Sequence, residues 1–353
     1  MGSEMCIRDR LKIGGRVKIG NLDTRDKVMI VAEIGNNHEG SVELGRQLVD
    51  KAADAGVDAV KFQTFKTETF VSPGDVDRFN RMKGFELTTE NFEELAIRAR
   101  NNGMLFISTP LDMPSATFLI KIVDALKIAS GDNTFYPLIE LVSKSDKPII
   151  LSTGFADEEQ IKFSASLIKN NRPMRTSYSG LALLHCVSAY PVSPSDANLS
   201  AIRTLAEKFP STTIGYSDHT IGNEAAILAV AAGARIIEKH FTIDRNYSEF
   251  RDHQLSADPT SMAELVTKIR DTEILLGTGS LDPREIERNT EPPVRRSIAA
   301  ARNIEAGDTI VYNDIMWIRP GNGFRPGLEH QVLGKTLKNS IQIGELFSNE
   351  HFS

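Results

Sequence analysis

Two short apolar runs in this chain read Thr213-Ile-Gly-Tyr-Ser-Asp-His219 and Ala234-Arg-Ile-Ile-Glu-Lys-His240. Each run ends at a histidine, and the two histidines are separated by about one helix-plus-strand repeat. If both runs are parallel strands, the two imidazoles emerge side by side at one edge of a sheet. Neutral imidazoles at adjacent strand ends suit a divalent metal, and the alternative is a pair of hydrogen-bonded structural histidines.

Similar apolar runs recur along the chain between amphipathic helical stretches. They lie at residues 28–34, 59–63, 104–108, 125–129, 148–152, 182–187, 213–216 and 235–240. Continuous apolarity is typical of parallel strands that are buried on both faces. The repeat therefore predicts an α/β fold, a (β/α)8 TIM barrel over residues 11–278. A doubly wound open sheet is the alternative, but its Gly-x-Gly-x-x-Gly turn after the first strand is missing.

The two ends of the chain differ from this repeat. Residues 1–10 show no pattern, and we expect them to be a leader outside the fold. Residues 11–20 alternate like a small hairpin around Gly14-Gly15. After residue 278 a polar stretch, 279–293, ends in Pro292-Pro293 and indicates a linker. Short β-like runs broken by glycines then predict a small β-rich domain over residues 294–353.

Composition excludes several classes of protein. The 353 residues are 41% hydrophobic and 25% charged, which is ordinary for a globular protein. A net charge of −6 argues against a nucleic-acid partner. No apolar run approaches the ~20 residues of a membrane helix, so we expect no membrane partner. The two cysteines, Cys6 and Cys186, fit a reducing compartment and predict a cytoplasmic protein.

Polar residues follow most of the predicted strands, at the face where TIM barrels build their active sites. Lys61 and Lys127 lie inside apolar strands, where a buried ammonium needs an anionic partner. With the nearby hydroxyls they favour a site for a phosphate or carboxylate, and a structural ion pair is the alternative. Glu33 is a candidate acid or base, whose alternative role is to pair with a lysine.

The strand-end motifs occur in a recognisable order. They are Glu33-Ile-Gly-Asn-Asn-His-Glu-Gly40, Lys61-Phe-Gln-Thr64, Ile107-Ser-Thr-Pro110, Lys127-Ile-Ala-Ser-Gly131, Ile150-Leu-Ser-Thr-Gly154, Leu184-His-Cys186, Tyr190-Pro191, Ile214-Gly-Tyr-Ser-Asp-His-Thr220 and Glu238-Lys-His-Phe-Thr242. This series closely resembles the sialic acid (N-acetylneuraminate) synthase family. Arg319-Pro-Gly-Asn-Gly323 is similar to the C-terminal antifreeze-like (SAF) domain of that family.

The resemblance implies a synthase that condenses phosphoenolpyruvate with an N-acylated amino sugar of the N-acetylmannosamine type. The products would be phosphate and a nine-carbon 2-keto-3-deoxy sugar acid. The implied catalytic residues are Glu33, Lys61, Lys127, His219 and His240. The two histidines would hold Mn²⁺ or Mg²⁺, which would polarise the sugar aldehyde as a Lewis acid.

Substrate contacts are also implied by the resemblance. Phosphoenolpyruvate would be bound by Lys61, Thr109, Lys127, Ser130, Ser152, Ser188 and Ser217. The sugar would be bound by Glu33, Gln63, Asp132, Tyr190, Asp252 and Arg319. Arg319 would reach the site of a partner subunit, which implies a domain-swapped homodimer. Two positions depart from the family pattern: Asp132 replaces a frequent glutamate, and Ser188 stands where some members have asparagine.

Other functions fit parts of the chain. A sister synthase would use a 2,4-diacetamido sugar to make a legionaminic or pseudaminic acid, and we expect residues 65–85 to select the sugar. A heptulosonate or octulosonate phosphate synthase is disfavoured, because its sugar-phosphate motif is missing and the C-terminal domain is extra. A non-enzymatic barrel with an ice-binding tail is disfavoured by the intact lysines and histidines.

Overall fold

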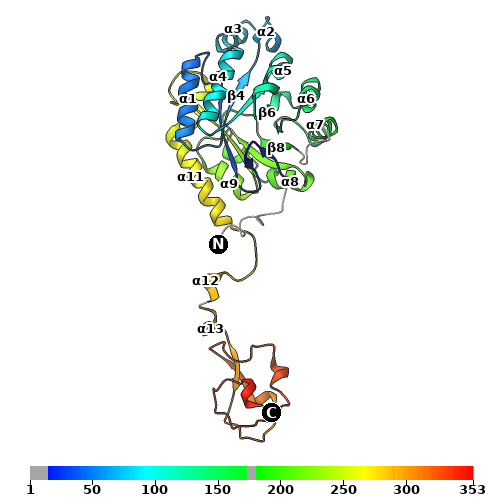
Figure 1. The fold of residues 1–353 in the computed structure, drawn as a ribbon, viewed down its shortest axis with the longest axis vertical. Helices are drawn as coiled ribbons and strands as arrows, with labels where there is room; N and C mark the ends of the chain where they lie inside the picture. Colours follow the sequence, from blue (N-terminus) through cyan, green and yellow to red (C-terminus); the bar gives the residue numbers. More distant parts are fainter. Residues whose placement is uncertain (1–14, 173–179, 289, 353) are drawn as a thin grey trace. The chain divides into compact units, whose positions relative to one another are not determined.

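The computed structural model describes residues 15–172, 180–288 and 290–352 (Figure 1). The predicted leader, residues 1–10, lies outside the described residues. The chain divides into two compact units, Met1–Gly279 and Ser280–Ser353. The predicted linker, residues 279–293, therefore falls at the start of the second unit.

The first unit is a closed barrel of eight parallel strands, as predicted, in the order β10-β3-β4-β5-β6-β7-β8-β9. The strands are β3 (Met29–Gly35), β4 (Ala59–Thr64), β5 (Leu105–Pro110), β6 (Ala125–Ile128), β7 (Ile149–Ser152), β8 (Leu181–Cys186), β9 (Thr213–Asp218) and β10 (Ile236–His240). Pairing of β10 with β3 closes the barrel and sets His240 opposite Glu33. Every predicted apolar run forms one of these strands.

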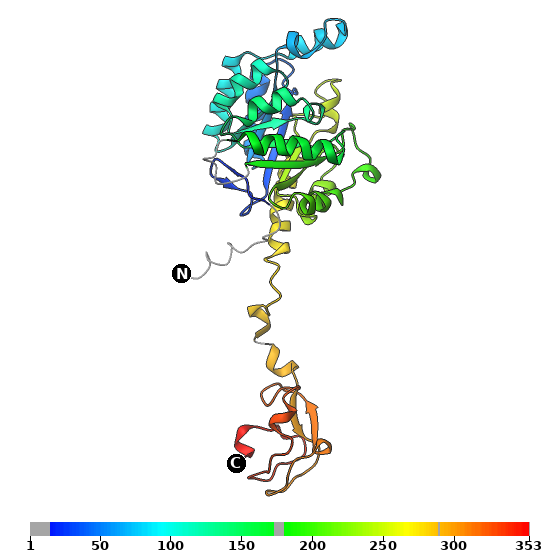
Figure 2. The same cartoon turned by 90° about the vertical axis from the view of Figure 1, so that its right-hand side faces the viewer.

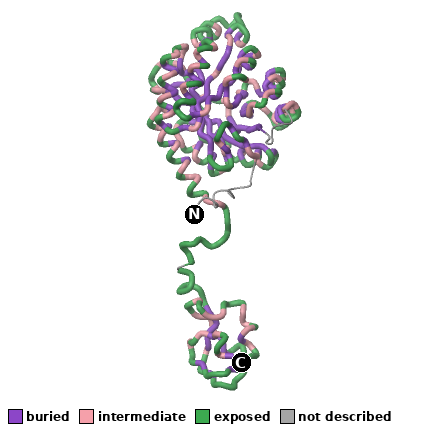
Figure 3. Tube along the Cα trace, viewed as in Figure 1, coloured by how far each residue is buried: buried purple, intermediate pink, exposed green. Residues whose placement is uncertain are grey.

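Helices surround the barrel, and their apolar faces cover the outside of the strands (Figures 1 and 3). They are α1 (Val42–Asp54), α4 (Thr89–Asn101), α5 (Met113–Ile122), α6 (Tyr136–Ser143), α7 (Glu158–Asn171), α8 (Ala201–Lys208), α9 (Glu224–Ala231) and α11 (Pro259–Leu276). The first begins where the Ser41 hydroxyl accepts a hydrogen bond from the Leu44 amide, which satisfies one free N–H of the first turn. It stops before Gly56, whose φ of +80° suits glycine.

One end of the barrel is closed by an apolar plug. A hairpin of β1 (Lys18–Ile19) and β2 (Leu22–Asp23) brings Val17 and Ile19 against inward-facing residues of the strands. This hairpin turns at Gly20-Asn21, where a two-residue Gly-Asn loop suits a tight turn and Gly20 has a positive φ. The hairpin predicted around Gly14-Gly15 falls partly on residues 11–14, which lie outside the described residues. Polar chemistry is thus left to the opposite, carboxyl end of the strands.

An insertion after β4 covers that opposite end. It contains α2 (Thr67–Phe70) and α3 (Val76–Phe85), which lie at the other end of the barrel from the hairpin (Figures 1 and 2). Phe65, Val71 and Met82 form a separate apolar cluster under it. After β10, the short helix α10 (Arg251–Leu255) also lies near this end. Two 3-10 turns, η1 (Ser130–Asp132) and η2 (Pro194–Asp196), follow β6 and β8.

The second unit has its own small core. Its elements are α12 (Glu285–Arg288), α13 (Glu291–Val294), β11 (Ser297–Ala300), η3 (Tyr312–Asp314), β12 (Ile315–Ile318), η4 (Glu329–Gln331) and η5 (Asn349–His351). The two strands pair antiparallel, and Ile298, Ile341 and Phe347 are among the residues buried around them. Across the described residues of both units, no helix is long and apolar enough to cross a membrane.

Candidate active site

A cavity of about 470 Å³ opens at the carboxyl end of the barrel strands. Each of the eight strands contributes at least one lining residue. The lining includes most of the predicted site residues: Glu33, Lys61, Gln63, Thr109, Lys127, Ser130, Ser152, Tyr190, Ser217, His219, Asp252 and His240. Residues far apart in the sequence meet here because parallel strands end at the same face of the barrel.

Three predicted residues are not part of this lining. Asp132 is half-buried in η1, and it is absent from the described residues around the cavity. Ser188 lines a neighbouring cavity of about 660 Å³ beside α7 and α8. Arg319 is exposed after β12 in the second unit. The predicted sugar contacts of Asp132 and Arg319 therefore stay predictions.

A buried charge cluster forms the floor of the cavity. The Lys61 ammonium lies 2.8 Å from a carboxylate oxygen of Glu33 and 3.6 Å from one of Glu238. The Lys127 ammonium donates to the same Glu238 oxygen at 2.9 Å. All four residues are at most 5% exposed. Two ammonium groups and two carboxylates thus compensate one another, which burial without water requires.

The cluster shifts the pKa values of its members in opposite directions. Burial raises the pKa of Glu33, although Lys61 opposes that increase. Burial opposes ionisation of Glu238 as well, but Lys127 and Lys61 together hold its pKa at about 2. Burial also lowers the pKa of Lys127. Glu33 is therefore the carboxyl group of the cluster that is best suited to exchange a proton.

The two histidines lie side by side, with ring centroids 5.4 Å apart. Tyr190 packs against both of them, at 4.2 Å from His219 and 5.9 Å from His240. The His219 Nδ1 lies 2.8 Å from the Val187 carbonyl oxygen. If that contact is a hydrogen bond from Nδ1–H, Nε2 keeps the lone pair that a ligand needs.

The donor set fits a weakly held divalent cation. A backbone carbonyl that orients a histidine through its second nitrogen is the usual support for a metal ligand. His240 Nδ1 is buried without a hydrogen-bond partner, and burial lowers the pKa of His240 well below its ordinary value. Its imidazole is thus neutral, the form that coordinates metals. In the described residues no third histidine, cysteine or carboxylate joins the pair into a larger metal-ligand group.

A group of serine hydroxyls lies next to the charge cluster. The Oγ atoms of Ser130, Ser152 and Ser188 are all buried without a hydrogen-bond partner. A Cβ added at Gly154 would lie 2.3 Å from the Ser188 hydroxyl and 2.7 Å from the Ser130 hydroxyl. Buried hydroxyls are rarely left unpaired, so the convergence of the Ser130 and Ser188 hydroxyls around a glycine indicates a site for an oxygen-rich anion. Ser188 takes part in this group although it lines the neighbouring cavity.

Ser217 and Thr109 have partners within the protein. The Ser217 hydroxyl donates to Glu238 at 3.0 Å, and the Lys61 ammonium donates to Thr109 at 3.3 Å. Gln63 donates to Glu33 at 3.3 Å and accepts from Asn36 at 2.8 Å. Ser217 and Thr109 thus already have partners, whereas the hydroxyls of Ser130, Ser152 and Ser188 do not.

The strand pattern missed several lining residues. They are Asn36, Ala129, Cys186, Glu238, Phe250 and Arg251; four more lining residues, Phe70, Arg78, Arg81 and Met82, lie in the segment 65–85 that is expected to select the sugar. Glu238 could have been found, because it lies two residues before His240 and strand side chains alternate between faces. The same alternation turns Lys239 away from the cavity, where it pairs with Asp218 at 2.8 Å.

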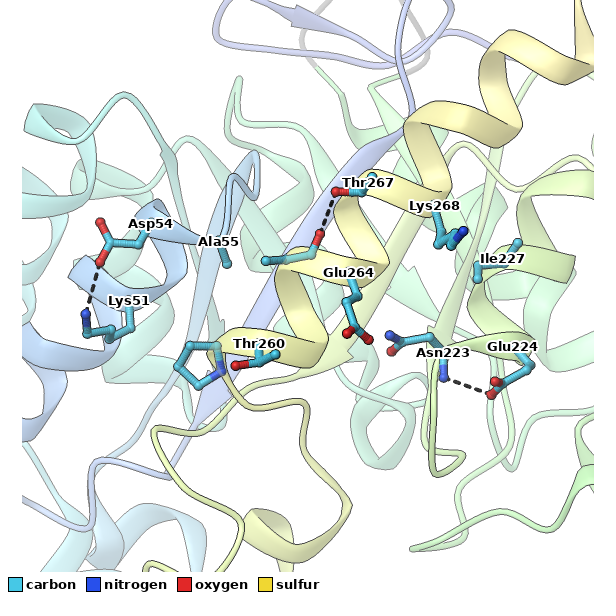
Figure 4. Close-up of a pocket in the computed structure, with 12 residues that line it drawn as sticks. Lys51, Asp54, Ala55, Asn223, Glu224, Ile227, Thr260, Glu264, Thr267 and Lys268 are labelled. Atoms are coloured by element: carbon cyan, nitrogen blue, oxygen red, sulfur yellow. Dashed lines mark hydrogen bonds and ion pairs between the residues drawn. The ribbon is translucent and has the colours of Figure 1, made fainter.

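A larger cavity of about 840 Å³ lies outside the barrel, among α1, α9 and α11 (Figure 4). Several of its polar groups bind one another. Lys51 pairs with Asp54, and the Asn223 amide donates to Glu224 (Figure 4). Among its described lining residues, this outer cavity has no unpartnered buried hydroxyl, whereas the barrel cavity has several. We therefore assign the candidate active site to the barrel cavity.

A parallel (β/α)8 barrel with convergent charged residues at its strand ends defines a TIM-barrel enzyme. The chain belongs to the NeuB family, whose model matches residues 48–281, and a SAF domain matches residues 295–353. It is 42% identical over 339 residues to an uncharacterised protein of Methanocaldococcus jannaschii, covering 96% of this chain and 97% of that protein. It is 37% identical over 356 residues to an N,N'-diacetyllegionaminic acid synthase of Legionella pneumophila, covering 96% and 99%.

The fold also matches a solved structure. A crystal structure of N-acetylneuraminic acid (sialic acid) synthetase from Leptospira borgpetersenii, in complex with citrate, superposes with a TM-score of 0.73. The two sequences are 38% identical, and the match covers 78% of this chain and 95% of that one. The chain is thus an enzyme of the family that forms sialic-acid-like sugar acids from phosphoenolpyruvate.

Proposed function

We propose that this enzyme condenses phosphoenolpyruvate with an N-acylated amino sugar of the N-acetylmannosamine type. C3 of phosphoenolpyruvate forms a bond to the sugar aldehyde carbon, water adds at C2, and phosphate leaves. The product is a nine-carbon 2-keto-3-deoxy sugar acid.

One observation carries the proposal. The unpartnered hydroxyls of Ser130 and Ser188 converge around Gly154, and the unpartnered Ser152 hydroxyl lies in the same cavity lining as Ser130, Lys61 and Lys127. A phosphate or carboxylate placed beside Gly154 would give the Ser130 and Ser188 hydroxyls a partner. Hydrogen bonds to such charged oxygens are the strong ones, at about 1.5–3 kcal/mol each.

Glu33 is the proposed proton carrier. Its raised pKa lets the carboxyl group hold a proton closer to neutral pH than an ordinary glutamate does. A protonated Glu33 can donate to the aldehyde oxygen as the carbon–carbon bond forms. Lys61, held between Glu33 and Glu238, would keep an anionic substrate oriented toward that proton.

His219 and His240 are the proposed ligands of a divalent cation, Mn²⁺ or Mg²⁺. When bound, the cation would supply Lewis-acid polarisation of the aldehyde oxygen. Tyr190, which packs on both imidazoles, would then line the sugar side of the cavity together with Gln63 and Asp252.

A 2,4-diacetamido sugar is the second candidate substrate. It is favoured by the 37% identity to a legionaminic acid synthase over nearly the whole of both chains. The likeness to a sialic acid synthetase is about as strong, so the two sugars need a direct comparison.

We also propose a homodimer in which Arg319 completes the site of the partner subunit. Large apolar side chains are exposed within each unit, including Ile274 and Leu275 on α11 of the first unit and Leu281 and Ile286 of the second, at 72–101% exposure. Such exposed apolar surface is typical of an interface. Light scattering should give twice the monomer mass, and R319A should lower turnover without changing that mass.

The deciding experiment is phosphate release from phosphoenolpyruvate with Mn²⁺, with N-acetylmannosamine and a 2,4-diacetamido sugar tested in parallel. Turnover with either sugar supports the proposed reaction and selects the substrate. Absence of turnover with both sugars, in protein that is folded and loaded with metal, would contradict it.

A further inference from the structure

Three arginines lie on the outer part of the cavity, and none of them belongs to the motifs at the strand ends. Arg78 and Arg81 come from α3, and Arg251 comes from the start of α10. Arg81 and Arg251 also line an adjoining cavity of about 570 Å³. The insertion after β4 and the segment after β10 therefore form a rim of guanidinium groups, which we call the arginine rim.

Aromatic contacts orient two of the three guanidinium groups of the arginine rim. The Arg78 guanidinium lies 5.5 Å from the centre of the Phe70 ring, and that of Arg251 lies 4.5 Å from the centre of the Tyr190 ring. Phe85 of α3 packs edge-on against Phe250 at 5.1 Å, which joins the two segments. Cation–π contacts orient a guanidinium but leave its N–H donors free for a ligand.

The guanidinium N–H donors of the arginine rim have few carboxylate partners among the described residues. Arg46, Arg98 and Arg270 each bind a carboxylate at 2.5–2.7 Å on the barrel surface. Arg251 by contrast has one carboxylate within ion-pair distance among the described residues, that of its neighbour Asp252 at 3.4 Å. Arg78 and Arg81 have no carboxylate within ion-pair distance in the described part of the chain.

The charge cluster explains why such a rim is needed. The Lys61 and Lys127 ammonium groups are already compensated by Glu33 and Glu238 at 2.8–3.6 Å. The floor is proposed above to take one anionic group of a substrate, so a second anionic group in the cavity would find few uncompensated cations there. The arginine rim supplies them, and guanidinium binds phosphate through two parallel hydrogen bonds.

We propose that Arg78, Arg81 and Arg251 form a binding subsite for a phosphomonoester at the mouth of the active site. This inference rests on the proposed function. Two substrates could bring this group: phosphoenolpyruvate, or an amino sugar phosphorylated at the end remote from its aldehyde. A sugar that extends from the floor toward the mouth would place its remote end at the arginine rim.

The test uses the full-length, metal-loaded enzyme with the variants R78Q/R81Q and R251Q. The control is R203Q, which removes the charge of an exposed arginine on α8 outside the cavity. We expect both rim variants to lower kcat/KM about 10- to 100-fold, the usual effect of losing one or two charge-assisted hydrogen bonds. R203Q should stay within about twofold of the wild type.

Kinetics with an unphosphorylated amino sugar and with its 6-phosphate separate the two sources. A raised KM for phosphoenolpyruvate with both sugars supports the subsite and assigns it to phosphoenolpyruvate. A loss confined to the sugar 6-phosphate supports the subsite and assigns it to the sugar. Unchanged constants for every substrate in folded rim variants would overturn the proposal.

A binding measurement keeps this test independent of the proposed reaction. If the wild type condenses none of the sugars, calorimetry can still compare binding of phosphoenolpyruvate and inorganic phosphate to wild type and R78Q/R81Q. Weaker binding by the variant would support the arginine rim while the proposed function fails. Equal binding would overturn the rim as well.

Discussion

Substitution of Gly154 by alanine is the sharpest test of the anion site. The added Cβ would lie 2.3 Å from the Ser188 hydroxyl and 2.7 Å from the Ser130 hydroxyl, both closer than such contacts allow. The methyl group must therefore displace the hydroxyls and fill the space that an anion's oxygens would use. Gly154 lacks a positive φ, so alanine is not excluded by the backbone.

The size of the effect follows from the hydrogen bonds that are lost. A hydrogen bond to a charged oxygen is worth about 1.5–3 kcal/mol, and each 1.4 kcal/mol changes affinity tenfold. Loss of one bond should weaken phosphoenolpyruvate binding about 10- to 100-fold, and loss of both should weaken it further. Overpacking itself costs about 1–3 kcal/mol of stability, so folding must be measured alongside.

G131A is the matched control. Gly131 lies beside Ser130, but an added Cβ there has no heavy atom within 4 Å, and its φ is not positive. The assay is the Kd for phosphoenolpyruvate by calorimetry and its KM in turnover, with Tm for each variant. A folded G154A enzyme that binds phosphoenolpyruvate as well as G131A does would refute the anion-site reasoning.

Three further predictions follow from the same geometry. H219A should abolish metal-dependent turnover while urea unfolding stays cooperative; retained turnover would remove the metal assignment. E238Q should lower the free energy of unfolding at pH 7 by about 3–5 kcal/mol, because it leaves buried ammonium groups without their carboxylate. The Glu238 pKa is held at about 2, so the wild type loses this stabilisation as pH falls from 4.5 toward 2, and its advantage over E238Q should shrink. Urea unfolding that gives the same difference between the two proteins at every pH would contradict this prediction. Burial lowers the pKa of His38 from 6.5 to about 4, so its contribution to stability is complete above 6.5 and is lost on acidification toward 4. The loss in free energy of unfolding is about 3 kcal/mol, and H38Q should make the free energy of unfolding nearly independent of pH over that range. If the pH dependence of H38Q equals that of the wild type, the loss does not come from His38.

Much of the barrel could be predicted from local pattern. Each strand is buried on both faces, so its apolar run is continuous and can be recognised without any partner strand. The errors lie at strand ends. The strand predicted to end at residue 216 continues to Asp218, and the one predicted to end at 108 continues to Pro110. The added polar residues, such as Asp218 and Thr109, are buried within the barrel and pair there with Lys239 and Lys61, so polarity does not end the strand.

The insertion after β4 was harder to predict. Its helices α2 and α3 are short and mostly exposed, so they lack the periodic apolar face that marks a longer helix. They are stabilised by Phe65, Val71 and Met82, which pack together with Leu111, a residue that follows β5 and is distant from them in the sequence. The arginine rim could not be recognised without that packing.

The sequence by itself determined the strands, their order and the residue types at their carboxyl ends, because these depend on burial and on neighbours along the chain. Only the tertiary structure decided which of those residues meet. It joins Lys127 to Glu238 and the Ser188 hydroxyl to Gly154, and it leaves Asp132 outside the cavity lining. The reason is that charge compensation and unpaired hydroxyls are properties of distances between strands, which are set when the barrel closes.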